Sequence, residues 1–80
     1  MMQANTIRSL IESGLPGAQV QVFGDDGAHF EAVVIAEQFQ GQSLVKRHQL
    51  VYACLGDRMR EEIHALQLRT LSPDEATARS

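Results

Sequence analysis

The chain has 80 residues, of which 44% are hydrophobic and 21% are charged, so we expect one small globular domain over residues 1–80. The formal net charge of −3 argues against a dedicated nucleic-acid-binding protein, because such proteins usually carry a basic excess. The single cysteine, Cys54, excludes an intramolecular disulfide and a multi-cysteine metal site. The sequence contains no secretory signal and no apolar run long enough to span a membrane, so we expect a cytoplasmic protein without membrane association.

The chain begins with a predicted amphipathic helix. Asn5 or Thr6 is the expected N-cap, and the glycines and proline of residues 13–17 are expected to end the helix. Within this turn, Gly14-Leu15-Pro16-Gly17 matches the GxxG loop of KH domains superficially. We interpret it as a simple turn, because it joins a helix to a strand and holds no basic residue.

A two-stranded hairpin follows. Apolar and polar residues alternate in AQVQVFG at 18–24, which is typical of a half-buried strand. GDDG at 24–27 predicts a tight turn, and HFEAVVIAE at 29–37 predicts a second strand, antiparallel to the first. The continuous apolar run AVVIA in this second strand predicts burial on both faces, and therefore a central position in the sheet.

The second half of the chain predicts a broken helix, a strand and a short last helix. Ser43 is the expected cap of the helix, and Gly56-Asp57 is expected to interrupt it. EEIHALQLRT at 61–70 predicts the third strand, and Ser72-Pro73-Asp74-Glu75 predicts the start of the last helix. The apolar stripe of the long helix is expected to comprise Leu44, Val45, His48, Val51, Tyr52, Leu55 and Met59.

The predicted order is α-β-β-α-α-β-α, an α+β fold with a three-stranded mixed sheet covered by helices. The strand–helix–strand crossover predicts that the second and third strands are parallel neighbours. His29 and His64 would then lie at the same edge of the sheet. Whether they form a site or are two structural histidines stays open at this point, because a shift of one residue moves a side chain to the other face.

Four short motifs carry a resemblance to a known family. They are Phe39-x-Gly41, Val45-Lys46-Arg47-His48, Val51-Tyr52 followed by Leu55, and Ile63-His64-Ala65-Leu66. This set resembles the BolA family over nearly the whole chain, and the short hairpin GDDGAHF is most similar to the bacterial IbaG (YrbA-like) branch. The resemblance implies a BolA-like fold, which is related to the type II KH arrangement.

The resemblance also implies a function. Members of the family bind monothiol glutaredoxins and share a bridging [2Fe–2S] cluster with them and with glutathione, so no cluster is expected in the isolated protein. His64 matches the family's characteristic cluster ligand, and His29 is the candidate second ligand, although it could instead be structural. Neutral imidazoles can replace thiolates on one iron, which raises the reduction potential and makes binding sensitive to pH. Cys54 is interpreted as a small, partly buried hydrophobic residue rather than a ligand.

Lys46, Arg47 and His48 form the densest basic segment and are the candidate partner-binding residues. The alternatives are a solvated helix face for Lys46 and a packed side chain for His48. A small DNA-binding transcriptional regulator is the second functional reading, and stress response, including acid stress, is implied by the family. The sequence shows no catalytic constellation, so we expect no enzyme, and we expect a monomer or a homodimer when the protein is alone.

Overall fold

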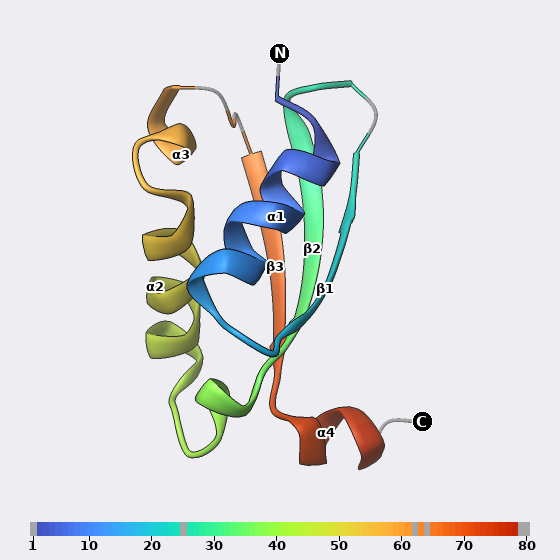
Figure 1. Ribbon diagram of the computed structural model, residues 1–80, viewed down its shortest axis with the longest axis vertical. Coiled ribbons are helices and arrows are strands. Elements are labelled where there is room, and N and C mark those ends of the chain that lie inside the picture. Colours follow the sequence, from blue (N-terminus) through green and yellow to red (C-terminus); the bar gives the residue numbers. More distant parts are fainter. Residues whose placement is uncertain (1, 25, 62, 64, 79–80) are drawn as a thin grey trace.

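The computed structural model of the chain describes residues 2–24, 26–61, 63 and 65–78. Figure 1 shows the predicted order of helices and strands, with one additional short 3₁₀ helix, η1, between β2 and α2. The elements are α1 (Ala4–Gly14), β1 (Gln19–Phe23), β2 (His29–Ile35), η1 (Glu37–Phe39), α2 (Leu44–Leu55), α3 (Arg58–Glu61), β3 (Ala65–Leu71) and α4 (Pro73–Ala78). In the part of the chain that the structure describes, no helix is both long enough and apolar enough to cross a lipid bilayer.

The three strands form one mixed sheet in the order β1-β2-β3. β1 pairs with β2 in the antiparallel sense, with Val20 opposite Val34, and β2 pairs with β3 in the parallel sense, with His29 opposite Ala65. The predicted central position of β2 and its parallel pairing with β3 are therefore confirmed.

The helices cover one face of the sheet. Phe30, Ala32 and Val34 of β2 point into the core, whereas Val33 and Ile35 are only half-buried on the opposite face. The predicted burial of β2 on both faces is therefore wrong. The physical reason is that β-branched side chains also suit a half-buried pleated surface, so an apolar run does not require a second covering layer. The buried hydrophobic residues are Met2, Ile7, Ile11, Leu15, Val20, Phe30, Ala32, Val34, Ala36, Phe39, Val51, Leu55 and Ile63.

The start of α1 differs from the prediction. The helix begins at Ala4 with Gln3 as its N-cap, and no side chain caps it, so the predicted capping by Asn5 or Thr6 is wrong. Met2 and Ile7 are both buried in the core, and they occupy the two positions that form a hydrophobic staple around an N-cap at Gln3. Apolar packing therefore fixes the helix start in place of a polar cap.

The long helix α2 is capped as predicted. The Ser43 hydroxyl accepts a hydrogen bond from the Lys46 backbone N–H at 3.2 Å, and Gly56 ends the helix with a φ of 57°. Of the predicted stripe, Val51 and Leu55 are buried, but Leu44 and Val45 are 63% and 68% exposed and Tyr52 is 38% exposed. The prediction of a wide apolar stripe is therefore wrong at its margins, because only the inner side of α2 packs against α1 and β3.

The third strand begins later than predicted. The predicted strand started at residue 61, but residues 58–61 form α3, and β3 begins at Ala65. β2 is the strand beside β3, and its pairing starts where His29 meets Ala65. A strand extended toward residue 61 would have no pairing partner in β2, which fits the helical turn that residues 58–61 form instead. Glu62 and His64 lie outside the described residues.

Candidate functional site

The starts of β2 and β3 lie side by side at one edge of the sheet. His29 is the first residue of β2 and is paired with Ala65, the first residue of β3. The Ala65 backbone N–H donates a hydrogen bond to the Ala28 carbonyl at 3.0 Å, which ties the end of the hairpin to the third strand. The predicted common edge is confirmed for His29 and Ala65. His64 directly precedes Ala65 in the chain but lies outside the described residues, so its role as a ligand stays a prediction.

The imidazole of His29 is held by a carboxylate from the preceding turn. Asp26 Oδ2 lies 2.8 Å from His29 Nδ1, and Asp26 Oδ1 accepts the backbone N–H groups of Ala28 and His29 at 2.9 and 2.8 Å. The two backbone hydrogen bonds, first that from His29, together with the imidazole hold the pKa of the Asp26 carboxyl well below its usual range. Sequence reasoning missed this contact, because GDDG at 24–27 predicts a tight turn but not which side chains the turn brings together. The spacing of Asp and His three residues apart in a turn was the available signal.

An open hollow adjoins His29 on the uncovered side of the sheet. Its volume is about 280 Å³, and Phe23, at 54% exposed, contributes an aromatic wall. The hollow is lined by Phe23, Gly24, His29, Phe30, Glu31, Ala65 and Gln67. His29 therefore lies beside an open hollow that both apolar and polar side chains line.

The residues at this edge fit one half of a metal site. His29 offers an imidazole whose Nδ1 is bonded to a carboxylate, which is the usual arrangement behind a histidine that ligates through Nε2. Among the residues that the structure describes, no group of three or more His, Cys, Asp and Glu side chains is arranged to hold a metal ion. His29 would therefore ligate iron only together with further ligands, from undescribed residues or from another molecule.

Lys46, Arg47 and His48 do not lie at this edge. Arg47 Nη1 donates to the Thr70 carbonyl near the end of β3, whereas His29 begins the neighbouring parallel strand. In Figure 1 the first turn of α2 lies near α4, at the opposite end of the sheet from the starts of β2 and β3. His29 and Arg47 therefore lie at opposite ends of the sheet.

Arg47 is engaged in contacts that connect α2 to the end of the chain. Its guanidinium forms a bidentate pair with Glu75 at 2.6 and 3.3 Å, and its side chain is only 11% exposed. It also donates from Nε to the Gln42 carbonyl at 3.0 Å and lies 5.9 Å from the centre of the Phe39 ring. These contacts give Arg47 a structural role, and its predicted role in partner binding stays a prediction.

Glu75 completes the predicted capping box of α4. Its Oε1 accepts the Ser72 backbone N–H at 2.8 Å, and its own N–H donates to the Ser72 hydroxyl at 3.3 Å. The hydrogen bond from Arg47 and that from the Ser72 backbone lower the pKa of Glu75 from 4.5 to about 2. One carboxylate therefore caps α4 and anchors it to α2.

His48 and Lys46 differ in their surroundings. The edge of the His48 ring faces Tyr52, with ring centres 6.3 Å apart, and its buried Nε2 has no hydrogen-bond partner among the described residues. His48 thus matches the packed alternative that the sequence left open. Lys46 is exposed at the start of α2 and is available to an acidic partner.

Cys54 has the partly buried environment that the sequence predicts. Burial raises the pKa of its thiol, and Sγ donates a hydrogen bond to the Leu50 carbonyl at 3.2 Å. A neutral thiol buried between α1 and α2 is a poor metal ligand.

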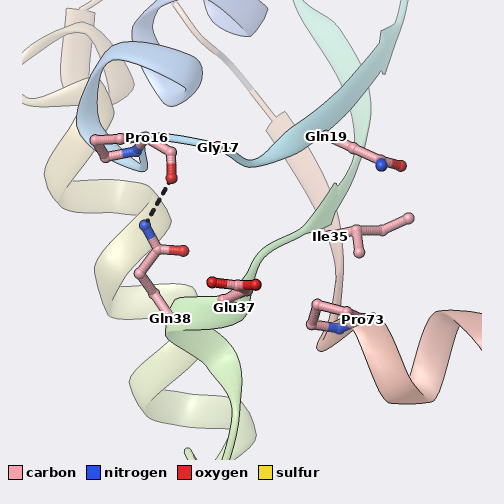
Figure 2. Close-up of a pocket in the computed structure, with 7 residues that line it drawn as sticks. All are labelled: Pro16, Gly17, Gln19, Ile35, Glu37, Gln38 and Pro73. Carbon is pink, nitrogen blue, oxygen red and sulfur yellow. Dashed lines mark hydrogen bonds between the residues drawn. The ribbon is translucent and has the colours of Figure 1, made fainter.

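A second hollow lies at the other end of the sheet. Figure 2 shows this cavity of about 350 Å³, in which the Gln38 amide donates to the Pro16 carbonyl at 3.1 Å. It is lined by Pro16, Gly17, Gln19, Ile35, Glu37, Gln38 and Pro73. His29, Lys46, Arg47 and His48 are not among these residues, so within the described part of the chain this hollow is separate from the His29 edge.

Comparison with known proteins places the chain in a family. A family model described as BolA-like protein matches residues 11–75. The acid stress protein IbaG of Escherichia coli is 36% identical over 75 residues, which cover 92% of this chain and 88% of that protein. A BolA homologue from Coxiella burnetii has a solved structure with a TM-score of 0.86 and 46% identity, covering 96% of this chain and 99% of the other.

Two further relatives have different names. SufE-like protein 1 of Arabidopsis thaliana is 45% identical over 53 residues, which cover 65% of this chain but only 14% of that longer protein. The solved BolA domain of SufE1 from the same plant has a TM-score of 0.77 and 34% identity, covering 90% of this chain and 93% of the domain. The DNA-binding transcriptional regulator BolA of Haemophilus influenzae is 34% identical over 53 residues, covering 66% of this chain and 52% of that protein. The chain belongs to the BolA family, and its fold is that of a BolA protein.

Proposed function

We propose that this chain is an adaptor that binds a monothiol glutaredoxin and shares a [2Fe–2S] cluster with it. His64 and His29 would be its ligands, and the complex would serve iron homeostasis and the response to stress. Membership of the BolA family supports the proposal, as does the name of the E. coli relative, acid stress protein IbaG. The observation that carries it is the carboxylate-bonded imidazole of His29 beside the start of β3.

The proposed chemistry divides the ligands between two molecules. The glutaredoxin cysteine and glutathione would supply thiolates, and this chain would supply neutral imidazoles to the other iron. When bound, such a cluster supplies one-electron redox chemistry, with a potential that imidazole ligation raises. The residues of this chain would bind the glutaredoxin and orient the ligand: Asp26 holds the His29 imidazole, and the open hollow would receive part of the glutaredoxin.

The test is to assemble the cluster anaerobically on this chain together with a monothiol glutaredoxin and glutathione, and to record visible absorption and circular dichroism. We expect His64→Ala and His29→Ala to change the spectrum of the heterocomplex, because each removes an iron ligand. Gln38→Ala is the control, since Gln38 is exposed at the second hollow, at the other end of the sheet. If the spectrum of the heterocomplex is unchanged in His64→Ala, His64 is not a ligand of the cluster.

DNA binding is the second candidate function, and one relative favours it. The Haemophilus influenzae relative is named as a DNA-binding transcriptional regulator. In this chain the exposed Lys46 is the basic group of the motif that is available to a phosphate, because Arg47 is bonded to Glu75. Salt-dependent DNA binding that Lys46→Glu removes would support this function, and no binding at low salt would exclude it.

A further inference from the structure

The turn before β2 contains a carboxylate whose geometry serves His29. Asp26 Oδ2 is 2.8 Å from His29 Nδ1, while Oδ1 accepts two backbone N–H groups, those of Ala28 and His29 itself. We propose that Asp26 is a positioning residue, which keeps the His29 proton on Nδ1 and directs the lone pair of Nε2 toward a metal. This inference rests on the proposed function and adds to it a residue that selects the ligating atom.

The choice of nitrogen follows from hydrogen-bond chemistry. An ionised carboxylate only accepts hydrogen bonds, so the imidazole nitrogen that faces it must carry the proton. A neutral imidazole has one protonated nitrogen, and its other nitrogen holds the lone pair that ligates a metal. Imidazole in water favours the opposite tautomer, with the proton on Nε2, so a proton on Nδ1 would be a signature of the Asp26 contact.

The orientation of the ring follows from the two backbone hydrogen bonds. The side chain of His29 is 63% exposed, so packing alone holds it weakly. Asp26 Oδ1 is fixed by the N–H groups of Ala28 and His29, the same backbone that carries the imidazole. Carboxylate and ring are therefore held as one unit at the start of β2, in the way that outer carboxylates orient metal-ligating histidines.

One substitution separates the two functions of the carboxylate. In Asp26→Asn the side-chain carbonyl can still accept both backbone N–H groups, so the turn is kept. The amide NH₂ then faces His29 Nδ1 and donates to it, which requires the proton to move to Nε2. The variant should therefore fold normally and present the wrong tautomer, as the same exchange does in the serine-protease triad.

The first measurement uses the isolated protein and needs no cluster. Long-range ¹H–¹⁵N NMR of the imidazole nitrogens, recorded at about pH 8 where histidine is ordinarily neutral, reports the tautomer directly. We expect the proton on Nδ1 of His29 in the unmodified protein and on Nε2 in Asp26→Asn. Asp74→Asn is the matched control, because it makes the same exchange at a carboxylate of α4, outside the His29 edge, and it should leave the tautomer unchanged. Predominance of the Nε2–H tautomer in the unmodified protein would overturn the proposal.

The second measurement uses the cluster-loaded heterocomplex with a monothiol glutaredoxin. We expect Asp26→Asn to weaken cluster retention by about 10- to 100-fold, the usual effect of losing an outer-shell partner, with no such loss in Asp74→Asn. An unchanged retention in Asp26→Asn, in a variant whose tautomer has moved, would contradict the role of Asp26 in ligation. If the tautomers are as expected but no heterocomplex cluster forms at all, the proposed function fails while the Asp26–His29 arrangement stands.

Discussion

At the scale of single residues, Gly24 sets the distance between the hairpin and His29. Gly24 has a φ of 154°, and a Cβ built on it would lie 2.6 Å from the His29 carbonyl oxygen and 2.6 Å from Phe30 Cδ1. The backbone of the hairpin can approach the start of β2 this closely only because residue 24 has no side chain.

We predict that Gly24→Ala disturbs the His29 edge and destabilises the protein by about 2 kcal/mol or more, since backbone strain and a steric clash combine. Urea unfolding and the NMR shifts of the His29 ring are the measurements. Gly17→Ala is the control: Gly17 has a φ of 85°, but a Cβ there meets nothing within 4 Å. Gly17→Ala should lower the free energy of unfolding only by the backbone strain, and the NMR signals of the His29 ring should not move. Equal effects of the two substitutions would contradict the role given to Gly24.

Single residues also show which positions and contacts can be predicted from the sequence. The pairing order predicted that His29 lies at the edge where the third strand starts, and the register of His29 with Ala65 confirms it. The spacing of Asp26 and His29 in a turn indicated that a contact was possible, but its geometry depends on how the turn folds back on its own backbone. The engagement of Arg47 by Glu75 could not be predicted, because it joins segments that meet only in the folded chain.

At the scale of elements, α1 and α2 meet closely where Gly14 faces Cys54. A Cβ built on Gly14 would lie 2.4 Å from the Cys54 sulfur. We predict that Gly14→Ala destabilises the protein by about 1–3 kcal/mol through overpacking, although alanine itself suits a helix.

Cys54→Ala removes the sulfur and should relieve part of this clash. The double variant should therefore be more stable than the sum of the single effects, by a coupling of about 0.5–3 kcal/mol. Chemical denaturation of the unmodified protein, the two single variants and the double variant measures this coupling. Strictly additive effects would show that the two helices adjust without a direct contact.

The contact between α2 and α4 gives the protein an acid-dependent part of its stability. The bonds from Arg47 and Ser72 lower the pKa of Glu75 from 4.5 to about 2, so the folded state favours the ionised form. This contribution is fully present above pH 4.5 and is lost as the pH falls toward 2, because protonation then breaks the bidentate pair.

We therefore predict that Glu75→Gln is less stable than the unmodified protein at neutral pH but loses less stability between pH 4.5 and 2. Urea unfolding midpoints recorded across this range test the prediction. Asp74→Asn, which removes the neighbouring carboxylate of α4, should follow the profile of the unmodified protein. Parallel profiles for Glu75→Gln and the unmodified protein would be the contrary result.

At the scale of the whole molecule, the sequence pattern predicted the order of elements and the pairing of the strands but not which surfaces are covered. The crossover between β2 and β3 leaves one favoured handedness and a parallel pairing, so topology follows from order. Coverage depends on how far the helices extend over the sheet, which an apolar run such as that of β2 does not indicate. Leu44 and Val45 on α2 are exposed for the same reason: their apolar character does not show whether another element covers them.

The overall arrangement separates two candidate functions in space. The His29 edge with its open hollow lies at the end of the sheet where β2 and β3 start, whereas the first turn of α2, which contains Lys46, lies near the opposite end. A glutaredoxin that shares a cluster should therefore contact the first end, and DNA bound through Lys46 should contact the second.

The most direct test of the central claim is a chemical-shift map of the ¹⁵N-labelled chain with an unlabelled monothiol glutaredoxin. We predict that the changes in backbone amide shifts concentrate in residues 24–31 and 65–67, around the His29 edge. Shifts confined to residues 44–48, or the absence of any shift at concentrations where the glutaredoxin is soluble and folded, would contradict it.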